Sequence, residues 1–361
     1  MLSNKEIICP NNLLDHAHKK KGVKAAIVNA GLPLPMLSVQ DAVNENLIIP
    51  IFIGNKDEIL KCADQLKWDI SEFEIIDEPV ENNTAKIAAK LASKDKVKII
   101  VKGHIHTDVL MKEVLKREYN LLGKTRLSHI WHMTVEKEDK PLIITDGALN
   151  VLPNVKTKMH ILRNVIDFSN RIGNERPKVA VLSATEEILD SVPSSLEANE
   201  ITKLAKEDNL NADVFGPLAF DNSISKKSAA IKGVKNIVAG EADVLLVPSV
   251  ETGNGLVKMM IYFMGACAAG VVVGGKVPVV ITSRSDEAQA RLASIELGTL
   301  SKTSSVADKT ATFGLLIPIR FEKSITFLNM CIFVFILGST FNAPSVIIMG
   351  LSSFSIVICQ I

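Results

Sequence analysis

The stretch that decides the fold is VVITSRSD, residues 279–286. An apolar β-branched run leads into a hydroxyl, a guanidinium and a carboxylate at Ser283, Arg284 and Asp286. Open α/β sheets bind their ligands where a strand ends and the chain turns into a helix. We therefore expect a buried strand over 277–282, a helix over 285–297, and the chemistry of the protein at the junction.

A second corner of the same kind comes earlier, in EADVLLVPSVETGNG at 241–255. The Val- and Leu-rich run at 244–248 predicts another buried strand. The short loop after it contains two glycines, which let a helix begin close to a bound group. The two corners are expected to face one crevice.

Short Val- and Ile-rich runs recur along the chain and alternate with helical patterns. They do not alternate polar and apolar residues, which is typical of strands covered on both faces by helices. We predict an α/β protein with a largely parallel sheet. The expected strands are 24–29, 47–53, 73–77, 97–101, 142–146, 178–184, 244–248, 270–273 and 277–282.

Composition narrows the function classes. The 361 residues suffice for two domains. A net charge of +1, from 41 basic and 40 acidic residues, argues against a surface that binds nucleic acid. Five scattered cysteines without a CxxC pair, and a polar N-terminus without a signal-peptide core, indicate a reducing cytoplasm.

The loop KGHIHTDVLMK at 102–112 is a candidate anion site. Lys102 and Lys112 lie at its two ends, and Thr107 or Asp108 is expected to cap the next helix. Alternating histidines, including His106, have no carboxylate or cysteine partner at metal-ligand spacing. We expect these histidines to be loop residues or to contact substrate, and we do not expect them to bind a metal. The same expectation covers the histidines at 129 and 132.

Two further turns carry open alternatives. Asp146, at the end of an expected strand, is either a substrate group or a turn former, and spacing alone does not choose between them. A helix is expected to open at Pro153 and run to about residue 171. The segment DVFGPLAFD at 213–221 reads as a rigid turn that suits a lobe contact, a dimer contact or a site wall.

Several long stretches occur in a fixed order. They are KGHIHTDVLMKEVL (102–115), GKTRLSHIWHM (123–133), PLIITDGALNVLPNVKTK (141–158), PKVAVLSATE (177–186), FGPLAFDNSIS (215–225), KGVKNIVAGEADVLLVPSVETGN (232–254) and KVPVVITSRSDEAQARLASIEL (276–297). On these stretches the chain, from about 27 to 300, resembles the phosphate acetyl/butyryltransferase family. The resemblance is greatest to phosphate butyryltransferases and to the transferase half of enoyl-CoA hydratase/phosphate acetyltransferase fusions.

The resemblance implies a two-domain α/β/α fold like that of isocitrate and isopropylmalate dehydrogenases, usually as a homodimer. It places one discontinuous domain at 1–125 plus 275–300 and the other at 126–274. It implies reversible transfer of a short acyl group, acetyl or butyryl, between coenzyme A and inorganic phosphate. Coenzyme A is then a substrate, and no bound cofactor or metal takes part.

The resemblance also assigns catalytic roles. Arg284 would hold the phosphoryl group bidentately, and Ser283 would donate a hydrogen bond to the reacting carbonyl oxygen or to the thioester sulfur. Asp286 would take the coenzyme A thiol proton, as the butyryl-type SRAD pattern suggests. The alternative is structural: Ser283 caps the helix and Arg284 pairs with Asp286.

The remaining family positions are substrate-binding candidates. Lys112 aligns with a second phosphate-binding arginine of acetyltransferases, so the charge is kept and the fork is lost. Glu251, Thr252 and Asn254 match the ETGN motif and should line the cleft. The other substrate-binding candidates are Lys102, His106, Thr107 and Asp146.

Two other functions are weighed. A nicotinamide-dependent decarboxylating dehydrogenase fails because the chain has neither the expected metal-binding aspartate cluster nor a convincing GxGxxG. A non-catalytic binder of acyl-CoA or acyl phosphate would follow if the change to Lys112 and the absent acetyltransferase aspartate had removed turnover.

The tail at 301–361 lies outside the resemblance. From 324 onward it has no charged residue. It is interpreted as a membrane anchor, a shifted or read-through frame, or an added packing segment. We favour an accidental or recently acquired tail, because neither the packing nor the chemistry needs it.

Overall fold

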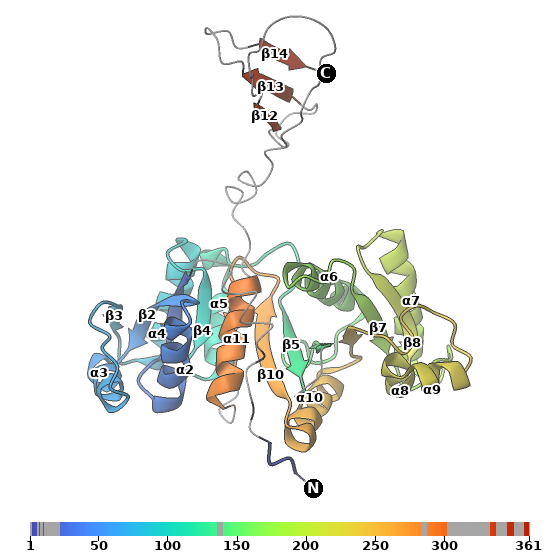
Figure 1. The fold of residues 1–361 in the computed structure, drawn as a ribbon, viewed down its shortest axis with the longest axis horizontal. Coiled ribbons are helices and arrows are strands. Elements are labelled where there is room, and N and C mark those ends of the chain that lie inside the picture. The colour runs from blue at the N-terminus through green and yellow to red at the C-terminus, as the bar shows by residue number, and fades with distance from the viewer. Residues whose placement is uncertain are drawn as a thin grey trace, which may run out of the picture. The chain divides into compact units, whose positions relative to one another are not determined.

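A computed structural model describes residues 2–5, 7, 10, 22–135, 140–282, 287–301, 333–336, 345–349 and 357–360. Residues 1–302 form one compact unit and 303–361 another. In the first unit, helices cover both faces of a large sheet (Figure 1).

The strands are β1 (Val23–Val28), β2 (Ile48–Gly54), β3 (Glu74–Asp77), β4 (Ile99–Lys102), β5 (Ser128–Thr134), β6 (Leu142–Thr145), β7 (Lys178–Leu182), β8 (Asp213–Leu218), β9 (Val244–Leu246), β10 (Cys267–Val273) and β11 (Val279–Val280). The helices are α2 (Pro33–Asn44), α3 (Lys56–Gln65), α4 (Glu81–Ser93), α5 (Thr107–Val114), the 3₁₀ helix η1 (Arg117–Tyr119), α6 (Val155–Arg171), α7 (Pro193–Glu207), α8 (Phe220–Ile224), α9 (Lys226–Ile231), α10 (Val250–Met264) and α11 (Ala288–Ser301).

The sheet has 11 strands in the order β3-β2-β1-β4-β11-β10-β5-β6-β9-β7-β8. Most neighbours are parallel, but β10 runs antiparallel to both β11 and β5, and β5 antiparallel to β6. Backbone pairing places Val280, Val271, Ile130 and Thr145 in one row across β11, β10, β5 and β6. The ends of β11 and β6 therefore lie level with each other, with two strands between them.

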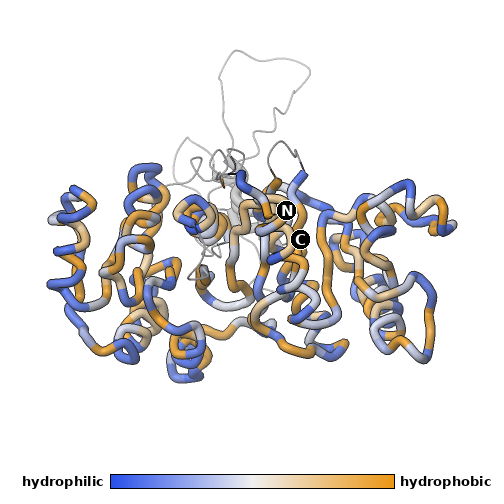
Figure 2. Tube along the Cα trace, turned by 90° about the horizontal axis from the view of Figure 1, so that it is seen from below, coloured by the Kyte–Doolittle hydropathy of each residue, from blue (hydrophilic) through white to orange (hydrophobic). Residues whose placement is uncertain are grey.

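Apolar side chains cover the sheet in three clusters. One cluster joins the sheet to α2, α6, α7 and α11. A second joins it to α4 and α5, and a third to α10. Figure 2 shows hydrophilic and hydrophobic residues alternating along the helical turns, as expected of helices with one face on a sheet.

The α/β prediction is confirmed, and all nine expected strands are present. Two strands of this sheet were missed. β5 interrupts its apolar pattern with a serine and two histidines, and β8 contains the Gly216-Pro217 pair that was interpreted as a turn. β8 is the last strand of the sheet, and an edge strand tolerates a proline because it needs fewer ladder hydrogen bonds.

The helix expected over 285–297 is α11, which begins at Ala288 and runs to Ser301. Three other helix starts also differ from the expectation. α10 begins at Val250, so the ETGN residues form its first turn and not a loop. α5 begins at Thr107, with His106 at the N-cap position and no side-chain cap bond. α6 begins after Asn154, whose side chain accepts a hydrogen bond from the Thr157 N–H at 3.0 Å.

The second unit contains three short antiparallel strands, β12 (Phe333–Ile336), β13 (Ser345–Met349) and β14 (Val357–Gln360). Most of the tail lies outside the described residues. Within the described parts of the chain, we find no helix with both the length and the hydropathy needed to cross a membrane. The three interpretations of the tail stay predictions.

Candidate active site

The three predicted catalytic residues, Ser283, Arg284 and Asp286, lie outside the described residues. The residues on either side of them are described. Thr282 follows β11 and is 4% exposed, and Glu287 precedes α11. The site is therefore built from these two flanks and from the elements that contact them.

Two buried cations converge on Thr282. The Nζ atom of Lys102, at the end of β4, lies 3.5 Å from the Thr282 carbonyl oxygen. The Nη1 atom of Arg291, one turn into α11, donates to the Thr282 hydroxyl at 2.8 Å. Lys102 and Arg291 are only 5% and 6% exposed. Burial of a cation is costly unless anionic or polar groups surround it, and both of these side chains have interaction partners within the chain.

The predicted anion-binding residue Lys102 is thus placed next to the 283–286 stretch. Arg291 was missed by sequence reasoning, which treated 285–297 only as a helix.

The floor beside Thr282 is made of His129 and Trp131 on β5 and Gly270 on β10. The two rings have centroids 4.5 Å apart. A Cβ atom on Gly270 would lie 2.9 Å from Trp131 Cζ3, 3.0 Å from the Ile281 carbonyl oxygen and 3.1 Å from His129 Cε1. Glycine at this position therefore permits β5 and the residue before Thr282 to approach closely.

The His129 side chain is neutral at physiological pH. Burial lowers its pKa to about 4, although the Asp146 carboxylate and the Ile281 carbonyl nearby favour the charged ring. Sequence reasoning expected this histidine to be a loop residue or to contact substrate, and did not favour a metal. The structure places it between the turn after β6 and the end of β11.

Asp146 is 2% exposed and accepts several hydrogen bonds from its surroundings. One carboxylate oxygen accepts from the Ala148 N–H at 3.0 Å and the Leu149 N–H at 2.9 Å. The other accepts from the His129 N–H at 3.1 Å, from the Asn150 N–H at 3.3 Å and from Asn150 Nδ2 at 2.6 Å. Of the two alternatives left open by the sequence, this geometry supports the turn former.

The first turn of α10 packs directly on the Asp146 turn. A Cβ atom on Gly253 would lie 2.7 Å from Gly147 Cα and 3.2 Å from the Asp146 carbonyl oxygen. This contact brings the ETGN residues beside the turn, with Glu251 and Asn254 exposed. A helix N-terminus presents free N–H groups, so it favours negative charge.

The Glu251 carboxyl group accepts hydrogen bonds at this helix N-terminus. Its own backbone N–H and the Ser249 hydroxyl lower the pKa of its carboxyl group. The Ser249 and Thr252 hydroxyl oxygens are 3.4 Å apart. The three ETGN candidates thus lie together at one helix start.

The remaining candidates, His106, Thr107 and Lys112, are exposed on α5. The His106 N–H donates to Glu81 Oε1 at 2.9 Å, and its Nδ1 lies 3.7 Å from the same oxygen. The loop before them is fixed to the end of β1, where the Gly103 N–H donates to the Val28 carbonyl at 2.9 Å. These contacts hold the loop against the end of β1 and the start of α4.

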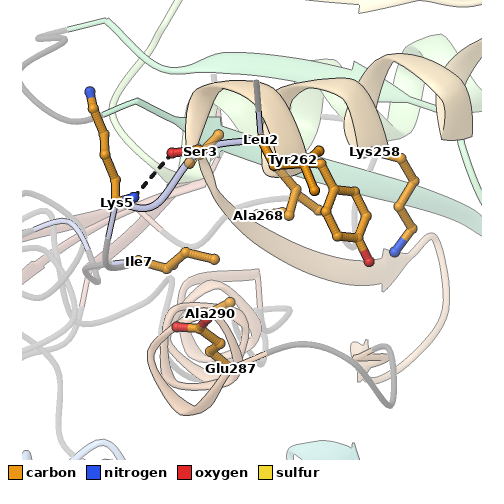
Figure 3. A pocket seen from close by; sticks show the side chains of 12 residues that line it. Leu2, Ser3, Lys5, Ile7, Lys258, Tyr262, Ala268, Glu287 and Ala290 are labelled. Carbon is orange, nitrogen blue, oxygen red and sulfur yellow. Dashed lines mark hydrogen bonds between the residues drawn. The ribbon is translucent and has the colours of Figure 1, made fainter.

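A cavity of about 230 Å³ adjoins the α11 side of the site. Figure 3 shows Lys258 and Tyr262 of α10 on one side and Glu287 and Ala290 at the start of α11 on another. The N-terminal segment covers it, with the Ser3 N–H donating to the Tyr262 carbonyl at 2.8 Å. Within the described ranges, no group of three His, Cys, Asp or Glu side chains is arranged to hold a metal ion.

The chain is similar to several known proteins. The family model described as "Phosphate acetyl/butaryl transferase" matches residues 54–297. A phosphate acetyltransferase of Rickettsia prowazekii (strain Madrid E) is 39% identical over 288 residues, which are 79% of this chain and 82% of the relative. A phosphate butyryltransferase of Clostridium acetobutylicum is 36% identical over 284 residues, which are 78% of this chain and 94% of the relative.

Solved structures agree with these similarities. A branched-chain phosphotransacylase from Enterococcus faecalis V583 matches with a TM-score of 0.70 and 30% identity, covering 78% of this chain and 100% of that chain. A structure described as a putative 4-hydroxythreonine-4-phosphate dehydrogenase from Salmonella typhimurium matches at 15% identity with a TM-score of 0.50, which is a likeness of fold alone.

Proposed function

Because the chain belongs to the phosphate acetyl/butyryltransferase family, we propose that it transfers a short acyl group reversibly between coenzyme A and inorganic phosphate. The observation that carries the proposal is the buried cation Lys102 beside the carbonyl of Thr282, the residue immediately before Ser283 and Arg284 in the sequence. Phosphate and acyl phosphate are anions, and a buried cationic strand end suits them.

The reaction needs a group that accepts the thiol proton and groups that stabilise negative charge on the phosphate and carbonyl oxygens. Toward acyl-CoA, the coenzyme A sulfur attacks the carbonyl carbon of the acyl phosphate, and the thiol proton passes to Asp286. The tetrahedral intermediate then collapses, the bond from carbon to the phosphate oxygen breaks, and phosphate leaves. Arg284 and Lys102 stabilise the charge on the phosphate oxygens, while Ser283 donates to the carbonyl oxygen as it becomes negative.

The outer candidates complete the substrate site in this proposal. His106, Thr107 and Lys112 face the phosphate side from α5, and the α10 start supplies Glu251, Thr252 and Asn254. Asp146 contributes by fixing the turn on which α10 rests. These roles follow the family motifs and the exposure of the side chains.

We place acetyl first among the acyl groups, with butyryl as the alternative. The relatives are named for both reactions, at 39% and 36% identity. A pocket that accepts one or two more methylenes differs by only about 1–3 kcal/mol, so the ranking needs a measurement.

The assembly that fits this proposal is a cytoplasmic homodimer whose subunits have two α/β domains, 1–125 plus 275–300 and 126–274, on the isocitrate/isopropylmalate dehydrogenase plan. An apolar groove of about 770 Å³ supports the dimer. It is lined by four methionines of β5 and α10 and by Phe220 and Ile224 of α8. Met259 and Met264 remain 44% and 42% exposed in the single chain.

The test is turnover by the purified full-length chain. The chain is given phosphate with acetyl-CoA or butyryl-CoA, and thiol release and acyl phosphate are measured together. We expect equal amounts of both products, formed only when phosphate is present. Binding of acyl-CoA without release of thiol, in the intact protein, would instead indicate the non-catalytic binder.

A further inference from the structure

We propose that Arg291 is a positioning residue for the acyl transfer, and that it acts by holding Thr282 at the point where the chain enters the 283–286 stretch. The inference rests on the proposed function, and it concerns a residue to which the family motifs considered above assign no role. Its basis is the pair of contacts that fix Thr282 from two different elements.

Both polar groups of Thr282 are engaged. The hydroxyl oxygen accepts from Arg291 Nη1 at 2.8 Å, and the carbonyl oxygen lies 3.5 Å from Lys102 Nζ. The first contact comes from α11, which follows the 283–286 stretch, and the second from β4, which is the parallel neighbour of β11. Thr282 is thereby fixed on the side chain and on the backbone.

Arg291 is itself held in place. Its backbone N–H donates to the Glu287 carbonyl at 3.1 Å, and α11 packs against the sheet through buried residues on most of its length. The same helix contacts β10 through Ser294, whose hydroxyl accepts from the Gly270 N–H at 2.9 Å. The guanidinium therefore extends from a rigid helix to Thr282.

A short chain connects these two fixed points. Four residues, 283–286, separate Thr282 from Glu287 in the sequence. In this proposal, contacts that fix Thr282 help to position the catalytic groups that follow it in the chain. Loss of the contact is expected to reduce the rate of the chemical step more than the binding of coenzyme A.

The variants that test this are Thr282→Val, Thr282→Ser and Arg291→Lys. Valine keeps the shape of threonine and removes the acceptor, whereas serine keeps the acceptor. We expect Thr282→Val to lower kcat by about 10- to 100-fold with KM for acetyl-CoA changed less than about 3-fold, and Thr282→Ser to stay within about 3-fold of wild type. Arg291→Lys keeps the charge, loses the fork and should resemble Thr282→Val.

A matched control exists elsewhere in the fold. Thr157 on α6 is also buried, and its hydroxyl lies 3.2 Å from Arg126 Nη1. Thr157→Val removes the same kind of contact and should leave kcat at the wild-type value. The Thr282→Val/Arg291→Lys double variant should lower kcat by less than the product of the two single effects, because the two substitutions share one contact.

The outcomes separate the two hypotheses. Wild-type turnover with an unchanged kcat in folded Thr282→Val and Arg291→Lys overturns the positioning role and leaves the acyltransferase in place. A loss that appears mainly as a higher KM for phosphate also overturns it, because Arg291 would then contact the substrate. Absence of phosphate-dependent turnover in the wild type overturns the proposed function, and the positioning role with it. Urea unfolding of each variant confirms that the compared proteins are folded.

Discussion

The ends of β11 and β6 lie in one row of the sheet, but they are built differently. At the end of β6, donors from the backbone and from Asn150 surround the Asp146 carboxylate. At the end of β11, the cations Lys102 and Arg291 reach from other elements to Thr282, where the chain continues into 283–286. The comparison teaches that a charged residue at a strand end is not by itself a substrate group. The groups around the charged residue determine whether it stabilises a turn or is available to bind substrate.

The largest effect that would sharpen this comparison is expected at Arg284. Arg284→Ala should lower kcat/KM for phosphate-dependent turnover by about 10³-fold while the urea midpoint stays near wild type, because the lost interaction serves the transition state. The control is Arg171→Ala, which breaks the surface pair with Asp167 and should keep full activity. Near-wild-type turnover in Arg284→Ala would break the assignment of the β11 end to catalysis.

The opposite result is expected at the end of β6. Asp146→Ala leaves several buried N–H groups without their acceptor, so it should lower the free energy of unfolding by about 3 kcal/mol. Asp146→Asn keeps one oxygen and should lose about half as much. Urea unfolding measures both, with the exposed Asp167→Ala as the control, expected within about 0.5 kcal/mol of wild type.

Measuring kcat per folded molecule of the Asp146 variant separates a loss of stability from a loss of catalysis. Asp146→Asn should keep kcat within a few-fold of wild type at a temperature where it is folded. A stable Asp146→Asn protein with a large loss of kcat would place this carboxylate in the chemistry and remove the contrast between the two strand ends.

A smaller effect, on the pH dependence of stability, is expected from β5, one of the two strands between the ends of β11 and β6. Burial lowers the pKa of His132 to about 4, whereas an unfolded histidine titrates near ~6.5. The unfolded state therefore binds the proton more readily, so the stability due to the neutral ring is complete above pH 6.5 and is lost as the pH falls from 6.5 to 4. The expected loss between pH 7 and pH 5 is about 2 kcal/mol.

His132→Gln should remove this part of the pH dependence. Urea midpoints measured at pH 7, 6 and 5 should fall less steeply in His132→Gln than in the wild type. The exposed His104→Gln variant should keep the wild-type slope. Equal slopes in all three proteins would show that His132 is not held neutral by the fold. The remaining acid sensitivity of His132→Gln should come partly from His129, whose pKa is lowered to about 4 in the same way.

The sequence predicts the strands of this fold better than their neighbours in the sheet. Val- and Ile-rich runs such as 99–101 are apolar throughout because both faces of the strand are buried. β5 and β8 escaped because their polar residues and Gly216-Pro217 disturb that pattern. The antiparallel placement of β10 depends on its partners, which local composition does not contain.

The candidate site shows the same limit. Lys102 was predicted as an anion-binding candidate because loop glycine and lysine are local signals, and the structure adds its proximity to the Thr282 carbonyl. The roles of Asp146, His129 and Arg291 depend on contacts with residues far along the chain, such as the 2.8 Å contact between Arg291 and Thr282. The sequence placed Asp146 after a strand and Arg291 on a helix, missed the strand that carries His129, and did not show the partners of any of the three.

The smallest predicted effect tests the last part of the β11 end, Asp286. If this carboxylate takes the coenzyme A thiol proton, Asp286→Asn should lower kcat/KM for coenzyme A and acetyl phosphate by about tenfold at pH 6.5. The deficit should shrink toward pH 9, because a free thiol with a pKa near ~8.5 then supplies thiolate without a base. The measurement is the ratio of variant to wild type across this range, with Asp57→Asn on the surface of α3 as the control. A ratio that stays flat with pH would remove Asp286 from proton transfer. The end of β11 would then act by holding phosphate and orienting the carbonyl group, and its difference from the end of β6 would lie in its cations alone.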